Sequence, residues 1–260
     1  MKHDVNQPKI RERQTEILLL LYRFRFLNRA QIQKMLGHKN HRLVIEWLND
    51  LVEKGYIDCR FDKKLAASPT IYFLATASRK LLIDQLEIEP NLLNRIWREK
   101  NYSEEFRTHC LFVADIYLSL FNLENVKAGR LHFKTRTDLY GDDRFLVPAP
   151  DAYFIIRGKN KQKTCSMLEL LDDLPPSIIR KRIRSYFDYY DSDEWQERTH
   201  KAFPLIILVC PSKRIKSHLN YYIQSKLDED SDLKVYLTTW DLIKEKGLHN
   251  SILERVVPEE

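Results

Sequence analysis

Two acidic residues in the second half of the chain have the spacing expected of metal ligands on neighbouring strands. Asp151 follows Pro150, and Glu169 comes eighteen residues later in an apolar stretch that predicts a strand. A carboxylate on each of two adjacent strands can jointly bind a hard divalent cation, and nucleases cut phosphodiester bonds with that arrangement. Asp151 and Glu169 are therefore candidate catalytic residues and candidate metal ligands.

The position two residues after Glu169 is occupied by Leu171. Residues two apart in a strand share a face, and nucleases of this kind usually place a lysine there. Lys163 or Lys181 could supply the missing cation only by reaching in from elsewhere. Glu104 or Glu105, at the start of a predicted helix, could add a third carboxylate, and Glu105 is the candidate catalytic residue of the two. Without that lysine, the pattern predicts that the second half of the chain does not cut DNA. No cofactor is expected in that case, and Mg²⁺ is expected only if the site is active. In the competing interpretation, Asp151 is a turn residue and Glu169 a salt-bridge partner.

Composition excludes several classes of protein. The chain has 260 residues, 43% of them hydrophobic, which is enough for two modest globular domains. It has six glycines and neither a P-loop nor a GxGxxG pattern, so nucleotide-driven chemistry has no support. The four cysteines lie 45 to 55 residues apart without a CxxC pair, which predicts buried free thiols. No membrane span or signal-peptide core is evident, so we expect a cytoplasmic protein.

Positive charge is concentrated in the first third of the chain. The formal net charge is +6, and residues 1–90 contribute +5 of it, with 16 Lys and Arg against 11 Asp and Glu. A polyanion would therefore dock on this part of the molecule.

The same region has the element order of a small DNA-binding module. Apolar spacing predicts helices over 12–26, 29–36, 41–54 and 77–86, with Asn28 capping the second helix and Thr76 the fourth. Strands are predicted over 56–61 and 70–74, joined by a polar turn. The order, and the string LVEKGYI…IYFLATASRKLL, resembles a winged helix-turn-helix.

That resemblance assigns DNA contacts residue by residue. The helix over 41–54 would enter the major groove and read bases, and the preceding turn and the wing would contact phosphates. The base-reading candidates are Asn40, His41, Arg42, Ile45, Glu46 and Asn49, and the phosphate-binding candidates are Lys39, Arg60, Lys63 and Lys64. Two alternatives stay open, a solvated helix face and a protein-docking module.

The rest of the chain predicts an α/β body. A helix over 104–121 precedes strands over 130–137, 149–156 and 164–171, then a basic helix over 178–190 and a fully apolar strand over 203–210. A helix to about residue 226, a strand over 233–237 and a terminal helix follow. Three meandering strands, a helix and a buried strand resemble the core of the PD-(D/E)XK nuclease-like fold, with one mixed sheet.

The basic helix of the body has two interpretations. Arg180, Lys181 and Arg184 could line a DNA channel, or they could pair with Asp172, Asp173 and Asp188 across a solvated face. For the aromatic side chains of the same helix, Tyr186, Tyr189 and Tyr190, packing is favoured over base stacking. His109 is interpreted as a hydrogen-bonded core residue.

Taken together, the chain resembles the replication-relaxation family of plasmid and mobile-element proteins. The resemblance rests on the wing string and on THCLFVADIYLSL, VPAPDAYFII, MLELLDD and RKRIRSYFDYY, although Leu171 stands where the family often has an aspartate. It implies a winged helix-turn-helix over 1–90, a helical linker over 91–103 and a nuclease-like domain over 104–260. The implied function is sequence-specific binding of double-stranded DNA in replication, transfer or transcriptional control. There are two alternative functions, a metal-dependent endonuclease or nickase targeted by the winged helix, and a protein–protein adaptor. Candidate partners besides DNA are replication or transfer proteins and a second copy of the chain.

Overall fold

A computed structural model describes residues 10–61, 69–86, 88–99, 103–122, 130–158, 162–172, 174–229 and 231–258. The chain divides into two compact units, Met1–Ala114 and Asp115–Glu260. This division falls within helix α6 (Glu104–Phe121), which we expected to open the second domain. Among the described helices, none is both long and apolar enough to cross a membrane.

The N-terminal unit follows the predicted order of elements. Its helices and strands are α1 (Glu12–Phe24), β1 (Leu27–Asn28), α2 (Arg29–Met35), α3 (His41–Glu53), β2 (Ile57–Arg60), β3 (Ile71–Leu74), α4 (Thr76–Leu86) and α5 (Pro90–Glu99). The helix boundaries agree with the predictions to within two residues, although α4 begins at Thr76, so that Thr76 is inside the helix rather than before it.

Local signals explain where these helices begin and end. The Asn28 side chain accepts a hydrogen bond from the backbone N–H of Gln31, and the Gln31 side chain accepts one from the N–H of Asn28. This reciprocal cap fixes the start of α2. Gly37 and Gly55, which follow α2 and α3, have φ angles of +61° and +70° that favour glycine.

A three-stranded antiparallel sheet closes this unit. Strands β2 and β3 pair as the predicted hairpin, and β1 adds to the other side of β3, giving the order β1-β3-β2. The two-residue strand β1 was not predicted, because two residues are too few to show a periodic pattern. The core beneath it is apolar and fully buried, and includes Ile17, Leu18, Leu21, Leu27, Ile32, Val44, Leu48, Leu51 and Ile57.

The C-terminal unit is built on a mixed six-stranded sheet. After α6 come β4 (Leu131–Thr135), β5 (Ala152–Arg157), β6 (Lys163–Leu170), α7 (Pro176–Asp191), α8 (Glu194–Thr199), β7 (Leu205–Cys210), α9 (Lys213–Gln224), β8 (Val235–Thr239), α10 (Trp240–Lys246), a short 3-10 turn (Asn250–Ile252) and β9 (Glu254–Arg255). The helix over 194–199 and the last strand were not predicted.

The strand order in this sheet is β4-β5-β6-β7-β8-β9. Strands β4, β5 and β6 form an antiparallel meander, whereas β6, β7 and β8 are parallel because α7 with α8, and then α9, return the chain between them. The predicted mixed α/β sheet is confirmed. Strand β7 is buried along nearly all its length, as its uninterrupted apolar sequence predicts.

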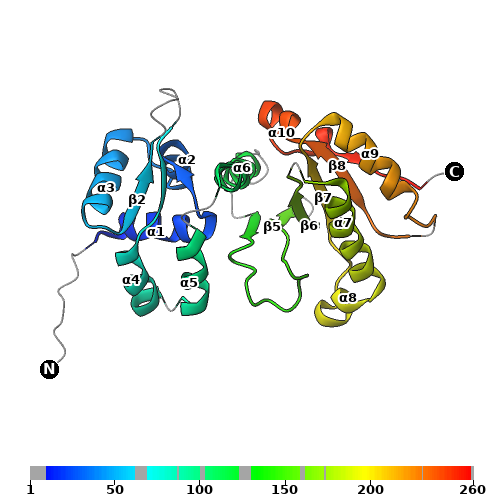
Figure 1. Ribbon diagram of the computed structural model, residues 1–260, viewed down its shortest axis with the longest axis horizontal. Helices are drawn as coiled ribbons and strands as arrows, with labels where there is room; N and C mark the ends of the chain where they lie inside the picture. Colours follow the sequence, from blue (N-terminus) through cyan, green and yellow to red (C-terminus); the bar gives the residue numbers. More distant parts are fainter. Residues whose placement is uncertain are drawn as a thin grey trace. The chain divides into compact units, whose positions relative to one another are not determined.

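Helices α7 and α9 cover one face of the sheet (Figure 1). Ile179 and Ile183 of α7, and Leu219 of α9, pack with the strand residues Met167 and Leu208 in one apolar core. On the other face, Tyr117 of α6 lies edge-on to Phe133, whose ring stacks on that of Phe154.

All four cysteines are free thiols. Cys110 and Cys210 are buried and Cys165 is half-buried, but Cys59 on β2 is exposed. The prediction of buried thiols is therefore wrong for Cys59, because β2 is buried only at its first residue, Ile57, and is exposed from Asp58 onward.

Candidate functional site

Helix α3 separates its side chains into a buried and an exposed face. Val44, Trp47, Leu48 and Leu51 are buried. The predicted base-reading residues lie on the other side, and all of them are exposed: His41, Arg42, Ile45, Glu46 and Asn49. The 3–4 spacing of the apolar residues dictates this separation, so the sequence correctly predicted which side chains point outward.

The turn before α3 is held by side-chain contacts. Gln33 of α2 donates hydrogen bonds from Nε2 to the carbonyl oxygens of His38 (3.1 Å) and Lys39 (3.3 Å). The His38 ring lies edge-on to Trp47, with centroids 4.9 Å apart. Asn40 is the N-cap of α3, and its Oδ1 accepts a hydrogen bond from the N–H of Arg42 (2.9 Å). These contacts fix the direction in which α3 begins and leave the amide nitrogen of the exposed Asn40 side chain available to an outside ligand.

The charges on this surface are exposed and mixed in sign. Lys39, Arg42 and Arg60 are exposed, and among the described residues Lys39 and Arg42 have no ion-pair partner. Asp50, about two turns after Arg42 on α3, accepts hydrogen bonds from Lys54 Nζ (2.7 Å) and Gln14 Nε2 (2.5 Å). The Lys54 contact is the main reason that the pKa of Asp50 is lowered. The predicted wing residues Lys63 and Lys64 lie outside the described residues.

The second group of predicted site residues lies within a buried charge cluster of the C-terminal unit. Asp151 immediately precedes β5, and Glu169 is the penultimate residue of β6. Both are brought to the same guanidinium: Arg136 Nη2 is 2.9 Å from Asp151 Oδ1 and 3.6 Å from Glu169 Oε1. Arg136 follows β4, so three neighbouring strands place these three charges together.

Helix α7 supplies a second arginine to this cluster. Arg182 donates from Nε to Glu169 Oε1 (3.0 Å) and from Nη2 to Glu169 Oε2 (2.8 Å), a two-pronged contact. The Tyr186 hydroxyl donates to Glu169 Oε2 (2.7 Å), and the backbone N–H of Leu170 donates to Asp151 Oδ2 (2.8 Å). Each carboxylate oxygen of Asp151 and Glu169 is therefore within reach of at least one N–H or O–H donor.

Both acids and Arg182 are shielded from water, which strengthens their electrostatic interactions, whereas the Arg136 side chain is 39% exposed at the edge of the cluster. The side chains of Asp151, Glu169 and Arg182 are 3%, 8% and 14% exposed. Burial alone would lower the pKa of Arg136, but Asp151 and Glu169 outweigh it and keep that pKa raised. Burial, followed by the charge of Glu169, raises the pKa of Tyr186 well above its usual value, so the phenol stays protonated and acts as a donor.

Leu171 lies on the same face of β6 as Glu169, as the alternation predicts, but in an apolar setting. Its side chain is 4% exposed and packs in the core with Met167, Ile179 and Ile183. The position at which a nuclease would present a lysine is therefore part of the core beneath α7.

The other predicted site residues lie away from the buried charge cluster or on the surface. Lys163 is at the opposite end of β6 from Glu169. Glu105 is exposed in the first turn of α6, in the N-terminal unit. Arg180, Lys181 and Arg184 are exposed on α7, and Arg180 lies over the Tyr222 ring, 5.8 Å from its centroid. Asp173 lies outside the described residues. The packing predicted for the tyrosines of α7 and for His109 is confirmed, since Tyr186, Tyr189 and His109 are buried and Tyr190 packs against the core.

Sequence reasoning missed Arg136 and did not assign a site role to Arg182. A signal for Arg182 was present: Ile179, Arg182, Ile183 and Tyr186 follow 3–4 spacing, which places an arginine on the apolar face of α7. A buried arginine requires an acidic partner, and Glu169 was a candidate carboxylate without an assigned partner. Arg136 lies in a turn, where no periodicity marks the direction of its side chain.

Comparison with models of known protein families shows to which family the chain belongs. A model of the Replication-relaxation family matches residues 18–206, more than half of the chain. The chain belongs to the Replication-relaxation family. A search of curated proteins found no match for this Replication-relaxation protein.

Two solved structures are among those similar to this Replication-relaxation protein. One is the crystal structure of Bacillus subtilis PadR in complex with operator DNA, with 13% identity and a TM-score of 0.28, covering 72% of this chain and 98% of that chain. The other is a pre-specific complex of the restriction endonuclease BsaWI with DNA, with 10% identity and a TM-score of 0.33, covering 95% of this chain and 87% of that chain.

Proposed function

We propose that this protein binds double-stranded DNA in a sequence-specific manner, through a winged helix-turn-helix formed by its N-terminal unit. The observation that carries the proposal is the exposed face of α3, whose first residues, His41 and Arg42, directly follow a hydrogen-bonded turn that contains Lys39 and Asn40. A helix with its apolar side buried and its first turns exposed can enter the major groove. Strands β2 and β3 would be the wing.

The charge pattern on α3 supports base contacts more than phosphate contacts along the helix itself. Arg42 is the basic residue of α3 within its first turns, and Glu46 is exposed one turn later. A glutamate repels phosphate but accepts a hydrogen bond from the N4 amino group of cytosine, and an arginine can donate two to guanine. Lys39, Arg60, Lys63 and Lys64 flank α3 in the sequence and would neutralise the phosphates.

Membership in the Replication-relaxation family supports a setting on a plasmid or mobile element, where such binding would serve replication, transfer or transcriptional control. The nuclease-like body would then be non-catalytic. Its two acids are held by two arginines and a tyrosine, and a Mg²⁺ ion bound to Asp151 and Glu169 would have to displace donors from both carboxylates and lie beside two guanidinium groups. The donor set therefore does not fit a metal ion.

One observation favours a metal-dependent nuclease as the second candidate. Asp151 and Glu169 both lie within 3.6 Å of a single cationic nitrogen, so the fold does bring the predicted pair together. In this candidate, Arg136 would occupy the place of the metal ion and would have to leave before cleavage.

The DNA-binding proposal is tested by selecting a site from random duplexes with the full-length protein and then measuring affinity by fluorescence anisotropy. Arg42→Ala should weaken binding to the selected site by about 1–3 kcal/mol and relax preference at one base position. Arg13→Ala is the matched control, because Arg13 is an exposed arginine of α1 that pairs with Glu16. Equal losses in the two variants, or no enriched sequence, would contradict the proposal.

A further inference from the structure

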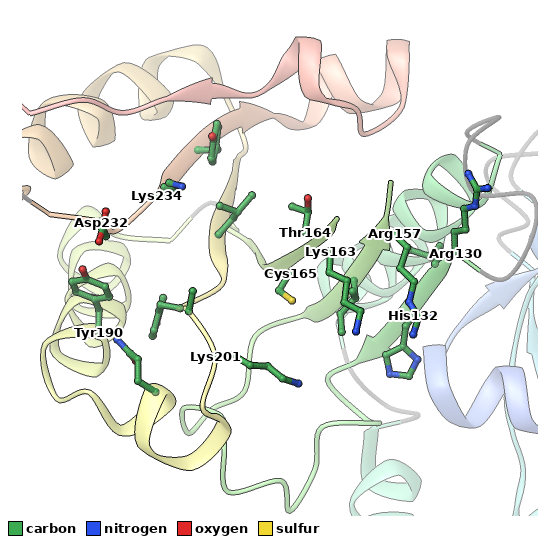
Figure 2. A pocket seen from close by; sticks show the side chains of 17 residues that line it. Arg130, His132, Arg157, Lys163, Thr164, Cys165, Tyr190, Lys201, Asp232 and Lys234 are labelled. Carbon is green, nitrogen blue, oxygen red and sulfur yellow. The ribbon is translucent and has the colours of Figure 1, made fainter. Parts of the chain in front are cut away.

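A large basic hollow lies at one end of the C-terminal sheet. Its volume is about 1360 Å³, larger than a site for one drug-sized ligand. Within the described residues, its lining includes five Lys and Arg residues and one acid: Arg130, Arg157, Lys163, Lys201, Lys234 and Asp232. Figure 2 shows Arg157, Lys163 and Lys201 extending into a shared space, with Tyr190 and Lys234 on its far side.

Topology brings together cations that are far apart in the sequence. Arg157 ends β5, Lys163 begins β6, and the register pairs these two residues directly. Arg130 immediately precedes β4, while Lys201 and Lys234 precede β7 and β8. Among the described residues, Arg157, Lys163, Lys201 and Lys234 are exposed and make no ion pair. Five cations against one acid give the lining a net positive charge, and Arg157 and Lys163 are direct cross-strand neighbours, so the hollow is suited to a polyanion.

This hollow is separate from the buried charge cluster. Asp151 precedes β5 and Arg157 ends it, so the two sites lie at opposite ends of that strand, about 20 Å apart for six residues at roughly 3.3 Å each. The ligand of the hollow therefore does not depend on whether the body cuts DNA, nor on the proposed role of α3.

The aromatic side chains of the lining narrow the class of polyanion. Half-buried Tyr236 and the exposed His132 ring line the hollow and are open to it, whereas the lining residues Tyr190 and Phe203 pack edge to face on each other and against the core. A groove that combines cations with partly open aromatic rings suits a strand whose bases are unstacked, because phosphates meet the cations and bases stack on the rings. Bases stacked inside a duplex cannot reach into such a hollow.

A second, smaller hollow adjoins the first. Its volume is about 730 Å³, and it shares Arg157, Thr164, Leu205 and Tyr236 with the larger one. The smaller hollow is lined by residues within the strands, such as Phe154, Ser166 and Ile207, so the two adjoining hollows offer more length than a compact small anion needs.

We propose that this end of the sheet binds single-stranded nucleic acid, with Lys163, Lys201 and Lys234 contacting its phosphates. In a protein that acts at an origin or a transfer site, such a surface would hold a strand released from the duplex.

The test compares two triple variants of the full-length protein with equal changes in net charge. Lys163→Gln, Lys201→Gln and Lys234→Gln neutralise the hollow, whereas Lys213→Gln, Lys226→Gln and Lys246→Gln neutralise lysines that do not line it. The probe is a fluorescent oligo(dT) of about 15 nucleotides, a length within the range that single-strand-binding folds cover, titrated at several salt concentrations. A duplex of unselected sequence is the second probe, and a thermal melt of each variant checks that it remains folded.

The expected result is a loss of oligo(dT) affinity of at least about tenfold in the hollow variant alone. Its dependence of log affinity on log salt should become shallower by about two units, because a single strand contributes about 0.7 per phosphate contact and three such contacts are removed. Duplex binding by the same variant should change much less than oligo(dT) binding does.

Three outcomes would overturn the proposal. The hollow and control variants could bind oligo(dT) equally well, or the hollow variant could lose duplex affinity as strongly as single-strand affinity. In the third outcome, only binding of a small anion such as thymidine triphosphate depends on the three lysines. An Arg42→Ala protein serves as a cross-check, since it should keep its oligo(dT) affinity whether or not α3 reads duplex DNA.

Discussion

The exposed face of α3 and the buried charge cluster of the C-terminal unit both contain charged side chains, but these are exposed on α3 and buried and paired in the cluster. On α3, Arg42 is exposed and without an ion-pair partner among the described residues. In the body, Arg182 is 14% exposed and holds Glu169 through two hydrogen bonds. A charge can bind an outside partner only if its own hydrogen-bonding capacity is not already used. Exposure and existing partners therefore distinguish residues that can bind a ligand from residues that stabilise the fold. Residue type alone does not, because both regions contain residues that the sequence marked as site candidates.

The largest expected effect is on the free energy of unfolding, through the buried charge cluster. Arg182→Ala should lower the free energy of unfolding by about 3–5 kcal/mol, because it leaves the Glu169 carboxylate buried without its main partner. Urea denaturation measures the change. Arg184→Ala, an exposed change on the same helix, should stay within about 0.5 kcal/mol. If the two variants were equally stable, the cluster would not be a paired, stabilising network.

A smaller effect is expected from the tyrosine that completes the cluster. Tyr186→Phe removes the hydrogen bond that the hydroxyl donates to Glu169 and the one that it accepts from Arg182, and should cost about 1.5–3 kcal/mol. Tyr221→Phe at an exposed position should change nothing. Chemical denaturation of both variants near neutral pH is the measurement. An unchanged Tyr186→Phe protein would show that the Glu169 contact contributes little.

The same tyrosine gives the folded protein a distinct alkaline response. Because the pKa of Tyr186 is raised in the folded state, the unfolded chain releases this proton first, at about pH 10, and the free energy of unfolding falls as pH rises beyond that value. Burial also raises the pKa of Cys210 to about 12, which acts in the same direction from about pH 9 upward. Melting temperatures should fall less steeply with rising alkaline pH in Tyr186→Phe than in the unmodified protein; equal slopes would contradict this assignment.

The sequence predicted elements well where one residue pattern determined them. Helix α6 was predicted at its observed bounds from its 3–4 apolar spacing, and β7 from its uninterrupted apolar run. The partners of Asp151 and Glu169 were not predicted, because they come from a turn after β4 and from α7, and only the folded sheet brings them together. The basic hollow has the same origin, since its cations lie at strand ends or in a loop that leads into a strand, and only the strand order assembles them.

The smallest expected effect concerns the predicted wing. Replacing Lys63 or Lys64 with Gln should weaken binding to every duplex to a similar extent, and each substitution that removes a phosphate interaction should reduce the salt slope by about one unit. Lys80→Gln, at an exposed position of α4, is the control. Anisotropy titrations at several salt concentrations would show the slope, and a slope unchanged from that of the control would remove these lysines from the interface.

The most direct test of the contrast between an open α3 face and a closed acidic pair is a nicking assay on DNA that the protein has bound. Supercoiled plasmid carrying the selected site is incubated with the full-length protein and Mg²⁺, at a protein concentration that a shift assay shows to be saturating. We expect the bound plasmid to remain supercoiled, because the carboxylates of Asp151 and Glu169 are occupied by Arg136 and Arg182. Nicking by the unmodified protein that disappears in both Asp151→Asn and Glu169→Gln would contradict this expectation.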